Sequence, residues 1–200
     1  MEAIGLIFNT LYYWGTPAKL LHWIGAAMIL FLYIHGLWIG DERPPLPGET
    51  AGNSGQILLH AAVGITLGLL MAGRYLWRLI NKIPMLPAKT PTWEKKLASL
   101  AHLGLYVATA IAILAGWLLA GARNPAVAVD LFGFIPVPTI AISADQASIE
   151  TLDLVHEVAA HLLIAMVVLH VFAALWHHYV QHDGVLKRML LRGQNRQRRR

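Results

Sequence analysis

The chain has 200 residues, of which 56% are hydrophobic and 14% charged, with a formal net charge of +5 and a mean hydropathy of +0.53. An average soluble domain carries roughly 25% charged residues, and a soluble protein this small could not bury so much apolar surface. Because cysteine is absent, the sequence excludes disulfides, thiolate metal sites, iron–sulfur clusters and covalently attached c-type haem. The composition predicts an integral membrane protein.

Four apolar stretches are long enough to cross a hydrocarbon core, which requires about 20 residues. We expect them near residues 18–39, 57–79, 98–120 and 152–180. The pattern shows no period-two alternation, which argues against a β-barrel. The sequence therefore predicts an all-α, integral membrane four-helix bundle. Residues 1–200 would form a single membrane domain that ends in a basic tail over residues 181–200.

The distribution of basic residues among the loops and termini predicts how the protein is oriented in the membrane. All but two of the 16 lysine and arginine residues lie near the N-terminus, around the connection between the second and third stretches, or in the C-terminal tail. The exceptions are Arg43 and Arg123, in the other two loops. By the positive-inside rule both termini are expected in the cytoplasm. The basic tail is expected to lie on anionic membrane lipid, not on nucleic acid.

The first apolar stretch and the loop over residues 121–150 allow two further predictions. No basic residues precede the first apolar stretch and no small-residue cleavage site follows it, so we do not expect a cleaved signal peptide. The loop over residues 121–150 contains prolines and two phenylalanines, Phe132 and Phe134. We expect this loop to form an ordered, partly apolar lid on the outer face.

Histidine is unusually frequent in the apolar stretches. A histidine inside a bilayer is energetically costly and by default marks a functional site. A single one is often only a hydrogen-bond partner between helices, but no structural need accounts for so many. Eight of the ten histidines lie in or at the ends of the expected spans: His22, His35, His60, His102, His156, His161, His170 and His177.

Helical geometry sorts these histidines into pairs. Each residue turns a helix by about 100° and advances it by about 1.5 Å. His156 and His170 therefore point within roughly 40° of each other and lie about 21 Å apart, whereas His161 points away from His170. At matching depths, His60 begins the second span on the outer side and His22 begins the first span on the inner side. The expected pairs are His60–His156 outside and His22–His170 inside.

Two neutral imidazoles from facing helices are the axial ligands that a low-spin b-type haem requires. Such a site leaves no open iron position, which favours electron transfer over oxygen binding. Zinc is the competing metal, but two histidines alone make a poor zinc site. The His156-Glu157…His161 run resembles a zinc-protease helix only superficially, because its second histidine is at i+5 and not at i+4.

Alternatives to parts of this assignment stay open. His102 and His35 are conceivable substitutes for His22 and His60. Glycines inside the spans would allow either a flat macrocycle or another helix to approach the backbone. These glycines are Gly25, Gly64, Gly68, Gly104 and Gly116.

Several motifs are shared with a known family. They are Leu21-His22-Trp23, Leu59-His60, Leu154-Val155-His156-Glu157, Leu169-His170-Val171, Gly116-Trp117…Ala122-Arg123, and Trp176-His177-His178-Tyr179…Asp183-Gly184-Val185-Leu186-Lys187-Arg188-Met189-Leu190. Together they make the sequence similar, over nearly its whole length, to the prokaryotic cytochrome b561 family.

The resemblance implies a four-helix, di-haem b-type cytochrome of the bacterial inner membrane. The family's axial ligands fall on His22 and His170 for the inner haem iron and on His60 and His156 for the outer one, so two non-covalent haems b are implied. Members exchange electrons with the ubiquinone pool. One family activity is oxidation of superoxide at the outer face, with the electrons passed to quinone inside.

The resemblance also suggests where substrates would bind. Arg123 could attract an anion such as superoxide, or could be an ordinary solvated loop residue. On the inner side, ubiquinone could contact His177, His178, Arg74 and Lys187. Alternatively, the His177–His178 pair could simply belong to an interfacial aromatic belt.

Two other functional classes compete with a superoxide oxidase. The first is an electron relay without catalysis of its own, a membrane anchor for a hydrogenase, a dehydrogenase or a periplasmic cytochrome. Anchors of this kind are usually longer and often have a fifth helix. The second is a histidine-lined transporter, which would need acidic residues at mid-membrane. Here the acids lie in loops and at helix ends, which disfavours transport.

Overall fold

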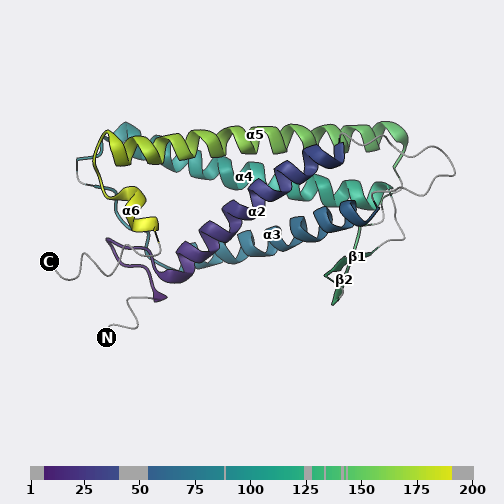
Figure 1. Cartoon of the computed structure of the whole chain (residues 1–200), viewed down its shortest axis with the longest axis horizontal. Helices are drawn as coiled ribbons and strands as arrows, with labels where there is room; N and C mark the ends of the chain where they lie inside the picture. Colours follow the sequence, from purple (N-terminus) through teal and green to yellow (C-terminus); the bar gives the residue numbers. More distant parts are fainter. Residues whose placement is uncertain are drawn as a thin grey trace. The chain divides into compact units, whose positions relative to one another are not determined.

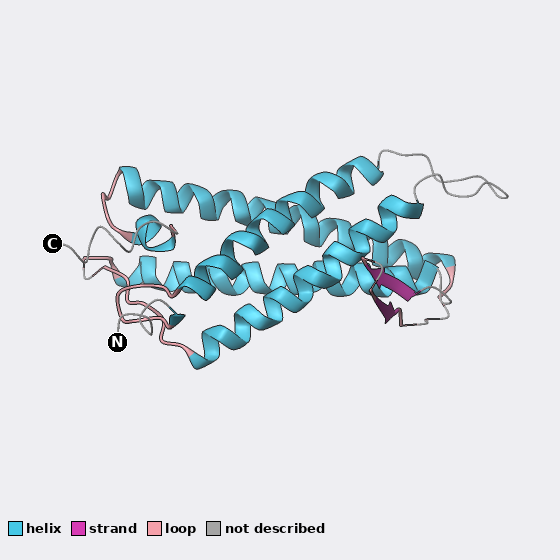
Figure 2. Ribbon diagram, turned by 60° about the horizontal axis from the view of Figure 1, so that its bottom comes forward, coloured by secondary structure: helices cyan, strands magenta, loops and turns pink. Residues whose placement is uncertain are grey.

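Helices account for most of the chain that the structure, a computed structural model, describes (Figures 1 and 2). The described residues are 7–40, 54–87, 89–123, 128–132, 134–140, 142 and 144–190. In chain order the elements are α2 (Thr16–Gly40), α3 (Ser54–Ile80), α4 (Thr92–Arg123), β1 (Ala128–Leu131), β2 (Ile135–Pro138), α5 (Gln146–Tyr179) and α6 (Val185–Met189).

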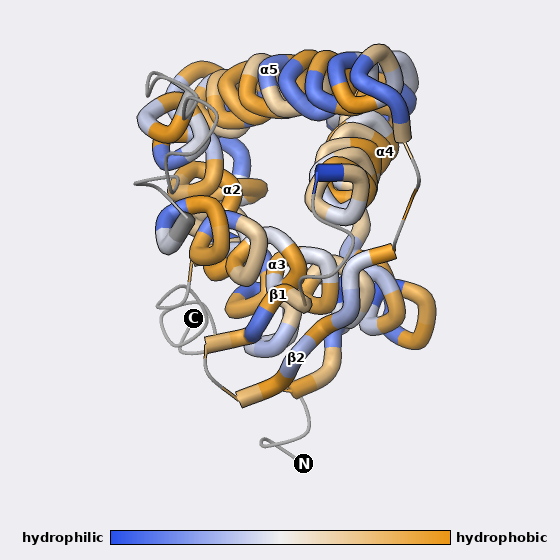
Figure 3. Tube along the Cα trace, turned by 90° about the vertical axis from the view of Figure 1, so that its right-hand side faces the viewer, coloured by the Kyte–Doolittle hydropathy of each residue, from blue (hydrophilic) through white to orange (hydrophobic). Residues whose placement is uncertain are grey.

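Four of these helices, α2 to α5, are long and apolar enough to cross a membrane. Hydrophobic residues, drawn in orange, recur along all four (Figure 3). This finding confirms the predicted fold class of four membrane-spanning helices. The orientation of the two termini stays a prediction, and Arg43, on which it partly rests, lies outside the described residues.

The helices extend beyond the predicted apolar stretches because polar residues continue them past the hydrocarbon core. Helix α4 begins at Thr92, directly after Pro91, and proline is well tolerated where a helix begins. Helix α5 begins at Gln146, where the carboxylate of Asp145 accepts a hydrogen bond from the backbone N–H of Ser148 at 2.9 Å. Hydrogen bonds from Ser148 also hold the pKa of the exposed Asp145 carboxyl below its ordinary value.

The chain divides into two compact units, and each long helix contributes a part to both. The first unit comprises Met1–Gly25, Leu70–Tyr106 and Ala165–Arg200, and the second comprises Ala26–Leu69 and Val107–Ile164. The single membrane domain over residues 1–200 stays a prediction.

In the first unit, the buried side chain of Asn9 joins the N-terminal segment to the end of α3. Its Oδ1 accepts a hydrogen bond from the Gly15 N–H, and its Nδ2 donates to the Lys82 carbonyl, both at 2.9 Å. The Asn9 backbone N–H donates to Oδ1 of Asn81 at 3.3 Å. One amide side chain therefore satisfies backbone groups from two segments that lie more than 60 residues apart in sequence.

The segment after α5 also packs onto the first unit. Nζ of the buried Lys19 donates to the Leu190 carbonyl at 3.0 Å, and the indole N–H of Trp23 donates to the Met189 carbonyl at 2.9 Å. The start of the predicted basic tail is thus ordered against α2, because it includes α6 and its carbonyls bind α2 side chains. The rest of the tail, residues 191–200, lies outside the described residues.

The predicted lid over residues 121–150 contains a β-hairpin in the second unit. Strands β1 and β2 are antiparallel, with Leu131 opposite Ile135, and Phe132 begins the turn with a positive φ of 57°. Gly121, near the end of α4, is needed for a close approach, because a Cβ at this position would collide with the Ile140 carbonyl. Val129 is buried, whereas Phe132 and Phe134 are exposed.

We predict that Asn9→Ala destabilises the protein. Removing the amide takes the hydrogen-bond partner from the buried Gly15 N–H and from the part-buried Lys82 carbonyl, which costs about 1–3 kcal/mol of unfolding free energy. The thermal unfolding midpoint of the purified protein should fall. Gln146→Ala is the control, because among the described residues its amide donates to the exposed Glu150 carboxylate. Equal midpoints for the two variants would contradict the prediction.

Candidate functional site

The four histidines predicted to be ligands form two ring pairs, one in each unit. In the second unit, His60 of α3 faces His156 of α5 with ring centroids 6.1 Å apart and an interplanar angle of 82°. In the first unit, His22 of α2 faces His170 of α5 at 6.2 Å and 68°. The structure therefore brings together both pairs that the sequence predicted, and α5 supplies one ring to each.

The spacing of both pairs fits two imidazoles that share one metal ion. When each ring binds from opposite sides with a nitrogen–metal distance of about 2.0 Å, the ring centroids lie about 6.3 Å apart. The observed 6.1 and 6.2 Å are close to this value. Bis-histidine coordination of a haem iron has this ligand arrangement. The residues present thus fit two such groups.

The His156 ring is oriented by the backbone of α4. Its Nδ1 donates to the Ala112 carbonyl at 2.7 Å, and because a carbonyl only accepts, the Nδ1 must carry the proton. In the neutral ring, Nε2 is then left with the lone pair that binds a metal. Gly116 makes room for this ring, since a Cβ there would lie 2.8 Å from His156 Cε1.

Of the other candidate glycines, Gly25 and Gly104 are covered by methionine side chains. A Cβ at Gly25 would meet Cε of Met71 at 2.5 Å, and a Cβ at Gly104 would collide with Cε of Met166. At these two glycines the close neighbour is therefore a packed methionine.

A third histidine accompanies each pair. In the first unit, His102 lies beside His170 with centroids 5.4 Å apart, and its Nδ1 donates to the Ala98 carbonyl of its own helix at 2.6 Å. In the second unit, His35 lies beside His60 at 5.8 Å. The 5.4 Å between His102 and His170 is shorter than the value of about 6.3 Å expected for two rings that share one iron, whereas the 6.2 Å between His22 and His170 is close to it. The spacing therefore favours His22 as the partner of His170.

The competing zinc interpretation finds no support in the described part of the chain. No group of three or more histidine, cysteine, aspartate or glutamate side chains there could hold a metal ion. His161 is exposed, its Nδ1 bonds to the Glu157 carbonyl, and its ring meets that of Tyr33. It takes no part in either pair, as the helical geometry predicted.

The candidate quinone residues all belong to the first unit but have different partners. His177 Nδ1 lies 2.6 Å from Asp183 Oδ2, whereas Arg74 donates to the Ala18 carbonyl at 3.0 Å. The Nδ1 of His178 is buried and has no hydrogen-bond partner among the described residues. Lys187 is exposed on α6. His178 is therefore the member of this group with an unused buried nitrogen.

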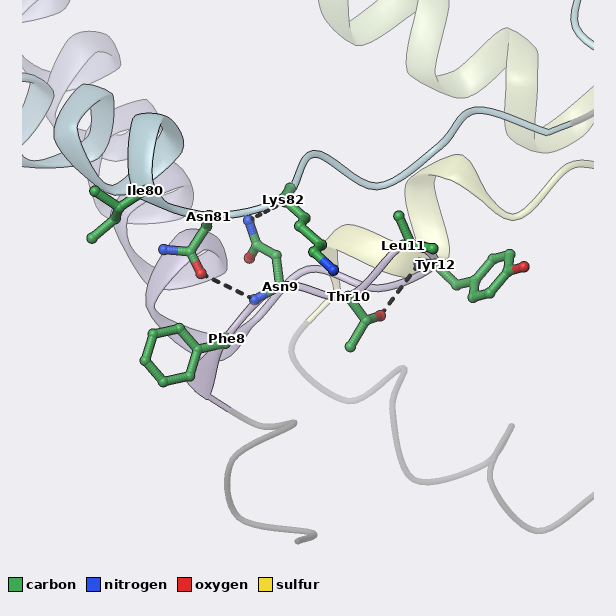
Figure 4. A pocket seen from close by; sticks show the side chains of 8 residues that line it. All are labelled: Phe8, Asn9, Thr10, Leu11, Tyr12, Ile80, Asn81 and Lys82. Atoms are coloured by element: carbon green, nitrogen blue, oxygen red, sulfur yellow. Dashed lines mark hydrogen bonds between the residues drawn. The ribbon is translucent and has the colours of Figure 1, made fainter.

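An open pocket of about 540 Å³ lies where the N-terminal segment meets the end of α3 (Figure 4). Sequence reasoning missed this pocket, because the contact between its two walls depends on the Asn9 hydrogen bonds. None of the four candidate quinone residues lines it, and the amides of Asn9 and Asn81 are already used in hydrogen bonds. Its lining residues are Phe8, Asn9, Thr10, Leu11, Tyr12, Ile80, Asn81 and Lys82.

Arg123, the candidate for anion attraction, has a partner that the sequence analysis did not identify. Its Nη2 lies 3.0 Å from Oδ2 of Asp153, and each side chain is about half exposed. The available signal was that Arg123 ends α4 and Asp153 lies near the start of α5. An approaching anion would have to compete with the Asp153 carboxylate for this guanidinium.

Comparison with known proteins gives consistent matches. The family model described as "Prokaryotic cytochrome b561" matches residues 13–192. "Cytochrome b561 homolog 2" of Escherichia coli (strain K12) is 30% identical over 184 residues, which cover 91% of this chain and 93% of that protein. "Cytochrome b561 homolog 1" of the same organism is 27% identical over 175 residues, covering 86% and 93%.

A shorter similarity extends to a second group of proteins. The "Probable Ni/Fe-hydrogenase B-type cytochrome subunit" of Azotobacter vinelandii is 30% identical over 97 residues. This match covers 44% of the chain and 40% of that subunit.

We predict that Gly116→Ala lowers haem content, because the new methyl group would displace the His156 ring. Alanine alone would favour the helix by about 1 kcal/mol relative to glycine, so a loss cannot come from a weaker helix. Bound haem in the purified protein, measured by the pyridine haemochrome assay, should fall toward half. Gly73→Ala is the control, since a Cβ at Gly73 meets no atom within 4 Å. Equal haem content in both variants would show that Gly116 has no such role.

Proposed function

The chain belongs to the prokaryotic cytochrome b561 family, and we propose on this premise that it carries two haems b and transfers electrons across the bacterial inner membrane. At the level of the family, it is a multi-pass membrane cytochrome that binds haem b and transfers electrons. The number of haems, the ligands, the donor and the acceptor are parts of the proposal.

The observation that carries the proposal is the spacing of the two histidine pairs, each assembled from two different helices. We assign His60 and His156 to one haem iron and His22 and His170 to the other. When bound, each haem supplies an iron that gains and loses one electron. The two histidines of each pair would hold the iron between them and would leave no position on it for oxygen or a substrate. The Ala112 carbonyl holds His156 in the tautomer that ligation requires.

We propose that the donor is an outer-face reductant such as superoxide and that the acceptor is ubiquinone on the cytoplasmic side. Arg123 would supply positive charge for an approaching anion, and Asp153 would moderate that attraction. On the cytoplasmic side, His178 is the favoured ubiquinone contact because its Nδ1 has no hydrogen-bond partner among the described residues. His177, Arg74 and Lys187 are the further candidates.

A second candidate function is an electron relay for a separate redox enzyme, without catalysis of its own. The similarity to a hydrogenase B-type cytochrome subunit favours it. That similarity covers only 40% of the subunit, whereas the match to "Cytochrome b561 homolog 2" covers 93% of that protein. We therefore place the relay second.

We predict that the purified protein holds two haems b and that replacing any one ligand removes one of them. His156→Ala and His60→Ala should lose the same spectral component, and His22→Ala and His170→Ala should lose the other. Haem quantitation and reduced-minus-oxidised spectra measure this. His161→Ala, an exposed histidine on the same helix as two of the ligands, should retain both haems. A protein without haem, or with one haem that persists in His156→Ala, would falsify the ligand assignment.

We also predict that superoxide reduces the purified cytochrome and that the electrons reach added ubiquinone. Arg123→Gln should lower the second-order rate by about twofold to tenfold at low ionic strength and by less at high salt, because the effect is electrostatic. Asp153→Asn should raise the rate, since it releases Arg123. Superoxide dismutase is the control and should abolish the reaction. A wild-type protein that superoxide does not reduce would favour the relay function.

A further inference from the structure

His35 is a buried histidine of the second unit that the proposed ligand pairs do not use. It lies on α2, and only 7% of its surface is exposed. Its Nε2 lies 3.0 Å from Oε1 of Gln56, near the start of α3. An imidazole buried so deeply needs a partner at each nitrogen, and Gln56 supplies only one of them.

Three aromatic rings hold His35 in place. Phe31 stacks on it with centroids 5.1 Å apart, and Trp38 meets it edge-on at 5.7 Å. The third neighbour is the proposed ligand His60, whose ring is nearly parallel to that of His35, at 16° and 5.8 Å. A Cβ at Gly36 would lie 3.3 Å from His60 Cε1, so His60 approaches α2 closely at this point.

His35 and His60 each have one ring nitrogen without a hydrogen-bond partner, and the two nitrogens have opposite hydrogen-bonding roles. The Nδ1 atoms of His35 and His60 are both buried and have no hydrogen-bond partner among the described residues. The Gln56 oxygen accepts the proton on His35 Nε2, which leaves the neutral His35 ring with a lone pair on Nδ1. A His60 that binds iron through Nε2 carries its proton on Nδ1. One ring thus has a spare acceptor and its neighbour a spare donor.

We propose that His35 is a positioning residue for His60, accepting the hydrogen bond of the His60 Nδ1–H when His60 binds haem iron. The inference rests on the proposed assignment of His60 as a ligand. Gln56 orients His35, and His35 in turn orients His60 through its ring. His35 thereby does for His60 what the Ala112 carbonyl does for His156, so each ligand of this pair has its own acceptor.

This hydrogen bond has an electronic consequence. An acceptor at Nδ1 makes a ligating imidazole more basic. A more basic ligand stabilises ferric iron relative to ferrous iron and lowers the reduction potential of the His60–His156 haem. In the first unit, His102 differs, since its Nδ1 already donates to its own helix and its ring meets His170 at 76°. The effect of His35 should therefore be confined to one haem.

The test is a spectroelectrochemical redox titration of the haem-loaded protein. His35→Phe keeps an aromatic ring between Phe31 and Trp38 but removes the acceptor, and it should bind both haems while one midpoint moves to a more positive value. The haem that shifts should be the one lost in His156→Ala. His35→Asn places an amide oxygen near the position of Nδ1 and should restore a midpoint close to that of the wild type. His161→Phe is the matched control and should leave both midpoints unchanged.

Other outcomes would overturn the inference. If His35→Phe keeps both haems and both midpoints, His35 does not act on His60. If His35→Phe loses a haem that His60→Phe retains, His35 is itself the ligand. If His35→Phe does not fold, Gln56→Leu decides, because it should raise the same midpoint and an unchanged value contradicts the proposal. Failure of the proposed function is distinct, since the wild-type protein would then hold no haem or His60→Ala would retain both.

Discussion

An imidazole inside an apolar helix must find partners for its nitrogens, and this requirement organises the interior of both units. Burying an unpartnered polar group costs several kcal/mol in an environment that offers no water. In the second unit, protein groups meet part of this requirement: the Ala112 carbonyl partners His156 and Gln56 partners His35. In the proposed function, the haem irons would bind one ring nitrogen of each of the four proposed ligands.

The small residues and the backbone of α4 are arranged around this requirement. Gly116 leaves space for the His156 ring, and Ala112, one helical turn earlier, presents its carbonyl to the same ring. The two positions are separated by four residues and thus lie on one face of α4. Helix α4, which supplies none of the proposed ligands, therefore orients the ring of His156 on α5.

Family membership and the geometry of the histidine pairs support different conclusions about the protein. The family establishes a multi-pass haem b cytochrome in electron transfer. The ring spacings support two bis-histidine sites, and such sites favour electron transfer because they leave no position on iron for a substrate. The donor and the acceptor belong to the proposal: Arg123, its proposed anion contact, is paired with Asp153, whereas the Nδ1 of His178, its proposed quinone contact, has no hydrogen-bond partner among the described residues.

The sequence by itself predicted the four spans with their approximate limits, from hydropathy, and the placing of His156 and His170 on one face of α5, from the constant turn of a helix. Shared motifs indicated the family. The pairing of these two histidines with His60 and His22 was predicted from matching depth and left His35 and His102 as alternatives. Only the tertiary structure decided the pairing of Arg123 with Asp153, the docking of residues 189 and 190 onto α2, and the position of His35 between Gln56 and His60. Helical periodicity specifies which face of a helix a residue occupies, but it does not specify the rotation of one helix against its neighbour, on which contacts between helices depend.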